Sequence, residues 1–123
     1  MLNECTSAYK KIGDKRLIVK NRDKEYQPKI SVHHEIRDGT EILYYVDQNS
    51  LSVDGVNEHG VAIVFNTIDF KSDHAELPTE NENRVIQALT KNNLRDVIYA
   101  LVADGGFNGV MIVSTPAATI LIE

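Results

Sequence analysis

Two short extended runs, residues 7–11 and 16–20, stand on either side of the turn residues Gly13-Asp14. Extended runs around a glycine-containing turn predict a β-hairpin. A hairpin of this length folds back on itself, so we expect residues 20–23 to lie near Cys5. A thiol beside a cation loses its proton more easily, and the thiolate is the reactive form. The first part of the chain therefore predicts a candidate reactive site at one end of a hairpin.

The same pattern of extended runs and turns continues along the chain, after a polar loop expected at residues 22–29. Asp38-Gly39 is a strong hairpin signal, and Asp54-Gly55 is expected to form another turn, followed by a tight turn at residues 56–60. The run 61–67 is apolar almost throughout, so we expect it in the centre of a sheet and covered on both faces. The further strands are expected at residues 30–37, 41–47, 50–53, 61–67, 109–114 and 118–122.

Two helices are expected between the strand at residues 61–67 and the strand at residues 109–114, after a polar connector at residues 69–78. Thr79 and Glu82 have the spacing of a capping box, which predicts a helix start. Asn92-Asn93 interrupts the helical pattern, and a second helix is expected at residues 94–103, ended by residues 104–106. Strands, then two helices, then strands again predict an α+β domain, with antiparallel sheets and two helices layered on them.

Composition narrows the class of protein. A length of 123 residues, 42% of them hydrophobic, suits one domain with a single core. The net charge of -5 argues against nucleic acid as a partner. A lone cysteine excludes an internal disulfide and suits reducing conditions, so we expect a cytoplasmic protein. The longest apolar runs are of strand length, far below the ~20 residues of a membrane helix, so no membrane partner is expected.

Three short motifs occur in a fixed order along the first half of the chain. Cys5-Thr6 lies on the first expected strand, and Lys20-Asn21-Arg22-Asp23 ends the second. The third motif is Gly55-Val56-Asn57-Glu58-His59-Gly60, which leads into an apolar strand that reaches Asn66. With these motifs the chain resembles the N-terminal part of an N-terminal-nucleophile (Ntn) hydrolase, of the choloylglycine hydrolase and penicillin V acylase family or the acyl-coenzyme A:isopenicillin N acyltransferase family.

The resemblance implies a partial or minimal αββα sandwich and a definite chemistry. Cys5 would become the first residue of the mature chain, and its own α-amine would act as the base for its thiol. The thiolate would attack a linear, non-peptide amide, and water or another amine would resolve the acyl-enzyme. The resemblance also implies that Lys20 favours the thiolate, Asp23 holds the α-amine or the substrate, and Asn66 donates to the oxyanion.

The resemblance also sets the expected organisation of the chain. Residues 1–4 would be a leader or propeptide that is removed at the Glu4-Cys5 bond. Residues 5–123 would form one Ntn-hydrolase-like domain, shorter than the family's usual sandwich. Lys20 stands where the bile-salt enzymes usually have arginine, which keeps the charge but loses the bidentate geometry.

Simpler interpretations exist for each candidate. Cys5 is also explained as an ordinary buried strand residue, Lys20 and Asp23 as a solvated ion pair, and Asn66 as the end of a strand. The adjacent residues His33-His34 do not predict a metal site, because neighbouring strand residues point to opposite faces. No cofactor or metal is expected.

The leading hypothesis is therefore a hydrolase or acyltransferase that acts on a small-molecule amide through Cys5. The alternative is a non-catalytic binding or assembly module of the same fold, or a fragment completed by a homo-oligomer or a complementing chain. An exposed sheet edge after Ile122 would be the physical sign of such a fragment.

Overall fold

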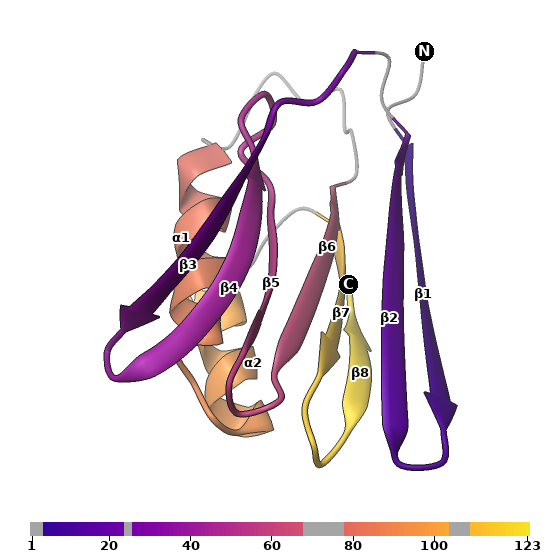
Figure 1. The fold of residues 1–123 in the computed structure, drawn as a ribbon, viewed down its shortest axis with the longest axis vertical. Helices are drawn as coiled ribbons and strands as arrows, with labels where there is room; N and C mark the ends of the chain where they lie inside the picture. The colour runs from indigo at the N-terminus through magenta and orange to yellow at the C-terminus, as the bar shows by residue number, and fades with distance from the viewer. Residues whose placement is uncertain (1–3, 24–25, 68–77, 104–108) are drawn as a thin grey trace.

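The computed structural model describes residues 4–23, 26–67, 78–103 and 109–123. The chain folds into an α+β structure with antiparallel sheets (Figure 1). None of the helices in these four ranges is long and apolar enough to cross a membrane. The elements in chain order are β1 (Glu4–Ile12), β2 (Lys15–Asp23), β3 (Ile30–Arg37), β4 (Thr40–Asp47), β5 (Val53–Asn57), β6 (Ala62–Thr67), α1 (Pro78–Leu89), α2 (Leu94–Val102), β7 (Gly109–Ser114) and β8 (Thr119–Ile122).

The strands form two sheets of unequal size. Strands β3 to β8 make one six-stranded antiparallel sheet in the order β3-β4-β5-β6-β7-β8. Among the described strands, β1 pairs only with β2. Strand β6 lies between β5 and β7, as expected for the apolar run 61–67. Strand β8 is an edge strand, so the segment that ends at Ile122 has one unpaired side in the described sheet.

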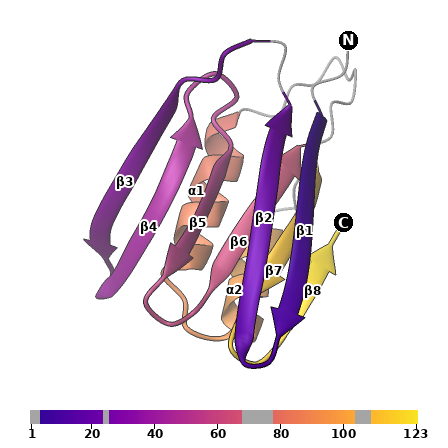
Figure 2. The same ribbon diagram turned by 45° about the vertical axis from the view of Figure 1, so that its right-hand side comes forward.

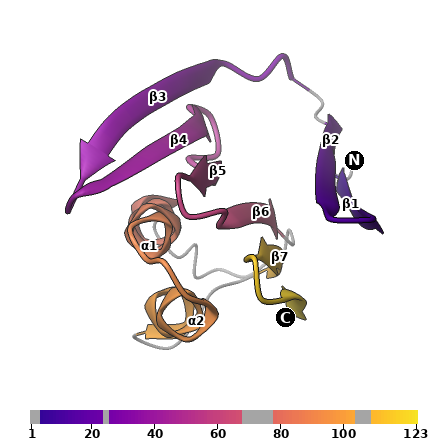
Figure 3. The same ribbon diagram turned by 60° about the horizontal axis from the view of Figure 1, so that its bottom comes forward.

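The two sheets and the helices form three layers. Helices α1 and α2 lie against one face of the six-stranded sheet, and the β1–β2 hairpin lies on the other side of it (Figure 3). The hairpin stands in front of β6 when the molecule is turned (Figure 2), and both of its strands contact β6. The prediction of antiparallel sheets with two helices layered on them is confirmed at this level.

The core lies between the helices and the six-stranded sheet. Alternate residues of β4, such as Ile42 and Tyr44, are buried toward the helices, while their neighbours point to the hairpin side. Burying these side chains is the main favourable contribution to folding. The core consists of Ile42, Tyr44, Val46, Val53, Val61, Ile63, Phe65, Val85, Ile86, Ala88, Leu89, Val97, Leu101, Met111 and Val113.

Helix α2 begins where the sequence predicts. Asn93 is its N-cap, and the side-chain oxygen of Asn93 accepts a hydrogen bond from the backbone N–H of Asp96 at 2.9 Å. Helix α1 begins at Pro78, one residue before the expected cap at Thr79. Of the connector expected at residues 69–78, only Pro78 is described, and it belongs to α1. The expected glycine stop at residues 104–106 lies outside the described residues.

The strand expected at residues 50–53 is wrong, because strand β5 begins only at Val53 and residues 50–52 lie in no strand. Two further predictions of local structure were wrong, and both matter for the site. Strand β2 continues to Asp23, so the polar loop does not begin at Arg22. Strand β5 spans Val53–Asn57, so Asp54-Gly55 is part of a strand and not a turn. In both cases side chains from distant strands bind the residue concerned, and these contacts override the local turn preference.

Candidate functional site

Cys5 is a half-buried free thiol on β1, near the open end of the hairpin. In the β1–β2 ladder Cys5 is paired with Arg22, and Ser7 is paired with Lys20. Side chains of directly paired residues stand on the same face of an antiparallel ladder. The hairpin therefore returns the segment 20–23 to Cys5, as the sequence predicts.

Strand β2 alternates strictly between its two faces. Counted over the whole residue, backbone included, Arg16, Ile18, Lys20 and Arg22 are half-buried and face the six-stranded sheet, and the exposed residues lie between them. Asp23 is exposed and belongs to the outer set. The structure thus brings Lys20 together with Cys5 but leaves the side chain of Asp23 on the other face of the hairpin.

Lys20 is a buried cation, with 4% of its side chain exposed. Its Nζ donates to both carboxylate oxygens of Asp54, at 3.1 and 2.9 Å, and to the carbonyl oxygen of Phe65. Burial lowers the pKa of Lys20 below its ordinary value, and the carboxylate of Asp54 opposes this shift. Cys5 also acts on the pKa of Lys20, which shows that the two groups lie within electrostatic range.

Arg22 carries a second cation into the same layer, with 10% of its side chain exposed. One terminal nitrogen donates to Asp47 at 3.1 Å and to the hydroxyl of Ser52 at 2.9 Å, and the other donates to Asp54 at 2.7 Å. The guanidinium carbon lies 5.0 Å from the centroid of the Tyr45 ring. Burial lowers the pKa of Arg22, but Asp54 and the hydrogen bonds outweigh burial, and the net pKa is raised.

Asp54 is the carboxylate at the centre of this cluster, and it is not among the site residues expected from the sequence. Besides Lys20 and Arg22, it accepts the backbone N–H of Phe65 at 2.6 Å. It therefore joins the hairpin to β5 and β6 at one point. The apolar residues Val53 and Val56 on either side of it indicate a buried strand, whereas the Asp-Gly pair indicates a turn.

Asp47 is a second buried carboxylate, at the end of β4. It accepts the backbone N–H groups of Asn49 and Ser50 at 2.9 and 3.4 Å, as well as the bond from Arg22. Burial raises the pKa of Asp47, but these N–H groups and Arg22 lower it more, so the net pKa lies below 3.8. Two buried carboxylates thus balance the two buried cations of β2, Lys20 and Arg22.

Asn66 lies on β6, on the face that meets the hairpin. The hydroxyl of Ser7 donates to Oδ1 of Asn66 at 2.8 Å. This contact does not use Nδ2 of Asn66, the nitrogen that an oxyanion would need as a donor. Because Ser7 is two residues from Cys5 on the same face, Asn66 is brought to the thiol side of the hairpin.

A pocket of about 450 Å³ opens between the hairpin and the six-stranded sheet. Lys20 and Asp54 supply its charged groups, and the remaining walls are mostly apolar. This size lies within the range of small-molecule sites. The walls include Ile18, Tyr45, Val56 and Val64.

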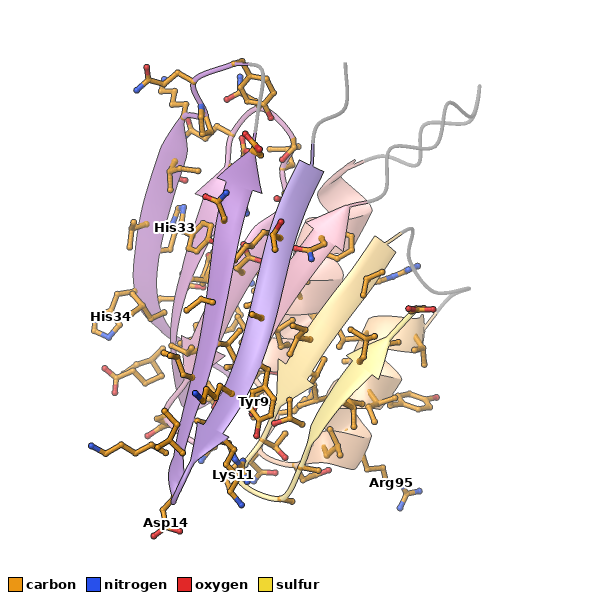
Figure 4. The ribbon with its side chains drawn as sticks, turned by 90° about the vertical axis from the view of Figure 1, so that its right-hand side faces the viewer. Tyr9, Lys11, Asp14, His33, His34 and Arg95 are labelled. Atoms are coloured by element: carbon orange, nitrogen blue, oxygen red, sulfur yellow. The ribbon has the colours of Figure 1, made fainter. Side chains whose placement is uncertain are left out.

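The histidines of β3 do not form a metal site. His33 stacks on Tyr44 with ring centroids 4.9 Å apart. Nε2 of His34 instead lies 2.6 Å from Oε1 of Glu41. Figure 4 shows the two rings pointing in different directions from the strand. Across the four described ranges, no three residues of the types His, Cys, Asp and Glu are grouped so as to hold a metal ion.

Comparison of the chain with models of protein families, with curated protein sequences and with solved structures found no match. The geometry of the site is therefore the basis for a functional argument.

Proposed function

We propose that this protein is an amidohydrolase or acyltransferase of the Ntn type, with Cys5 as its nucleophile. The observation that carries the proposal is the position of Cys5. Cys5 is paired with Arg22 in the ladder and lies on the same face of the hairpin as Lys20. Ser7, two residues further along this face, donates a hydrogen bond to Asn66. A half-buried thiol beside two cations is the environment in which reactive cysteines are found.

The proposed reaction begins after cleavage of the Glu4-Cys5 bond. The α-amine of Cys5 takes the thiol proton, and Sγ bonds to the carbonyl carbon of a linear amide. The C–N bond then breaks, and the leaving amine takes the proton from the α-ammonium group. Water or a second amine releases the acyl group from the thioester. Nδ2 of Asn66 would donate to the oxyanion.

The roles of the charged residues follow their positions. Lys20 would favour the thiolate from the same face of the hairpin, held by Asp54 at 2.9 Å. Asp54 is the carboxylate that forms ion pairs with both Lys20 and Arg22. The role proposed for Asp23 at the α-amine depends on the sequence resemblance alone, because its side chain is exposed on the outer face.

The layer order supports a partial or minimal αββα sandwich as the finer description of the fold. A helical layer, a six-stranded sheet and a two-stranded sheet follow one another (Figure 3). The pocket has a volume suited to a small ligand and is lined by Lys20, which lies on the same face of the hairpin as Cys5, although Cys5 itself is not among the lining residues. A small-molecule amide is therefore the proposed substrate.

Incubation of the protein with a panel of N-acyl amides, followed by mass spectrometry, tests the proposal. We expect release of the amine and a transient mass increase equal to the acyl group. Cys5→Ala should abolish both, and Asn66→Ala should slow turnover by roughly 10²–10³. Turnover that survives in Cys5→Ala would contradict the proposal.

A second candidate function, a non-catalytic binding or assembly module, is favoured by one exposed surface. The hairpin side of β3 and β4 exposes Val32, Ile36 and Leu43, with 71%, 76% and 47% of each residue accessible. Val32 and Leu43 line the pocket between this surface and the hairpin, whereas Ile36 is not among the residues that line it. Light scattering at rising concentration tests this candidate: a dimer or larger assembly supports it, and a monomer throughout contradicts self-assembly.

A further inference from the structure

The Nε atom of Arg22 is an unusual atom in this fold. Among the side chains that the structure describes, it is the one buried nitrogen or oxygen without a hydrogen-bond partner. Buried polar groups are almost always hydrogen-bonded, and a buried donor without an acceptor destabilises the fold. An orphan donor in an otherwise well-paired cluster therefore indicates an acceptor that is supplied from outside the chain.

The rest of the guanidinium group is held firmly. Its terminal nitrogens donate to Asp47, Ser52 and Asp54 at 2.7 to 3.1 Å. Its plane is supported by the ring of Tyr45, 5.0 Å from the guanidinium carbon. These contacts fix the direction of the Nε–H bond without using it, which is the condition for a preorganised donor.

The orphan donor belongs to the residue that is paired with the nucleophile. Cys5 and Arg22 are direct partners in the ladder, and the Cβ atoms of such pairs are ~4.5–5.5 Å apart. Nε is the guanidinium nitrogen closest to the backbone of β2, on the same face as the thiol. A carbonyl carbon bonded to Sγ of Cys5 would therefore hold its oxygen in the neighbourhood of this N–H group.

We propose that Nε–H of Arg22 donates a hydrogen bond to the oxygen of the carbonyl group that Cys5 attacks. This inference rests on the proposed function and adds Arg22 to its catalytic residues. When the bond from Sγ to carbon forms, the electron pair of the C=O π bond moves to oxygen, and the thiol proton goes to the α-amine. Arg22 keeps its proton throughout, and Asn66 supplies the second donor.

The test uses the processed protein, shown by its intact mass to begin at Cys5 and labelled with ¹⁵N, together with 1,1,1-trifluoroacetone, a ketone that adds thiols reversibly. Fluorine NMR reports the adduct at Cys5, and the proton–nitrogen spectrum reports Nε–H of Arg22, assigned by its loss in Arg22→Lys. We expect the Nε–H proton signal to shift downfield when the adduct forms, and no shift in Cys5→Ser. The adduct should also dissociate at least ~10-fold more readily in Arg22→Lys.

Arg16→Lys is the matched control. Arg16 lies on the same face of β2 and is also half-buried, but it donates to the carbonyl oxygen of Pro116, far along the strand from Cys5. Its replacement should leave the affinity for trifluoroacetone unchanged. If an adduct forms at Cys5 and the Nε–H signal of Arg22 does not shift, the inference about Arg22 is wrong and the proposed function still stands. Absence of any adduct at Cys5 overturns both the inference and the proposed function.

Discussion

The ammonium group of Lys20 lies 2.9 Å from Oδ2 of Asp54, and only 4% and 3% of the two side chains are exposed. A buried ion pair depends on both members, because a single charge left in the interior has no compensation. Asp54 also accepts from Arg22 at 2.7 Å, so this one carboxylate neutralises charge from two residues of β2. The attachment of the hairpin to the sheet is therefore expected to depend on Asp54.

Asp54→Asn should destabilise the fold by ~3–5 kcal/mol, the typical cost of breaking a buried pair from one side. Urea unfolding, followed by circular dichroism, measures the effect. Asp23→Asn is the control, since Asp23 is an exposed carboxylate on the outer face of the same hairpin and should change stability by less than ~0.5 kcal/mol. Equal effects of the two substitutions would contradict the account of the cluster.

The lowered pKa of Asp47 predicts that the folded protein loses stability in acid. Its pKa in the folded chain lies below 3.8, because the N–H groups of Asn49 and Ser50 and the cation of Arg22 outweigh the effect of burial. A carboxyl group whose pKa is lower in the folded state contributes stability above its unfolded pKa and loses it as the pH falls through the folded pKa. Unfolding free energies measured from pH 6 down to about pH 2.5 should therefore fall more gently for Asp47→Asn. Identical slopes for the two proteins would show that Asp47 does not contribute.

The raised pKa of Tyr45 predicts that the folded protein loses stability in base. Burial, with a contribution from Asp54, raises the pKa of Tyr45 to about 12. The folded chain then keeps a phenol proton that the unfolded chain releases near pH ~10, so stability decreases as the pH rises from about 10 toward 12. The absorbance titration of the wild-type protein minus that of Tyr45→Phe isolates this phenol. A difference curve centred near pH ~10 would refute the burial of Tyr45 against Asp54.

Gly55 is required by the packing of β5 against β4 and α1. A Cβ atom at this position would lie 2.6 Å from Cβ of Tyr44 and 2.7 Å from Cδ1 of Leu89. Gly55→Ala should therefore destabilise the fold by ~1–3 kcal/mol, as overpacked cores do. Gly13→Ala is the control for added bulk, since nothing lies within 4 Å of a Cβ at Gly13 and only its φ of +57° resists the change. A thermal melt of Gly55→Ala no lower than that of Gly13→Ala would contradict the packing described.

Much of the fold follows from local pattern. The expected strands at 30–37 and 109–114 coincide with β3 and β7, because each is an extended run with a clear glycine signal at one end. The expected break at Asn92-Asn93 is confirmed by the cap that Asn93 forms. Such elements are encoded by neighbouring residues, so a sequence shows them directly.

The charged cluster could be predicted only in part. The alternation that places Ile18 and Lys20 on one face of β2 also places Arg22 there, and one further step of the pattern would have found it. Asp54 is different, because its partners lie 34 and 32 residues earlier in the chain. An aspartate before a glycine indicates a turn until those long-range partners are known.

The measurement closest to the central claim is the intact mass of the purified protein, before and after a short exposure to iodoacetamide. The account predicts a chain that begins at Cys5 and gains one carbamidomethyl group faster than free cysteine does at the same pH. A chain that retains residues 1–4 and reacts no faster than free cysteine would contradict the claim that Cys5 is an N-terminal nucleophile.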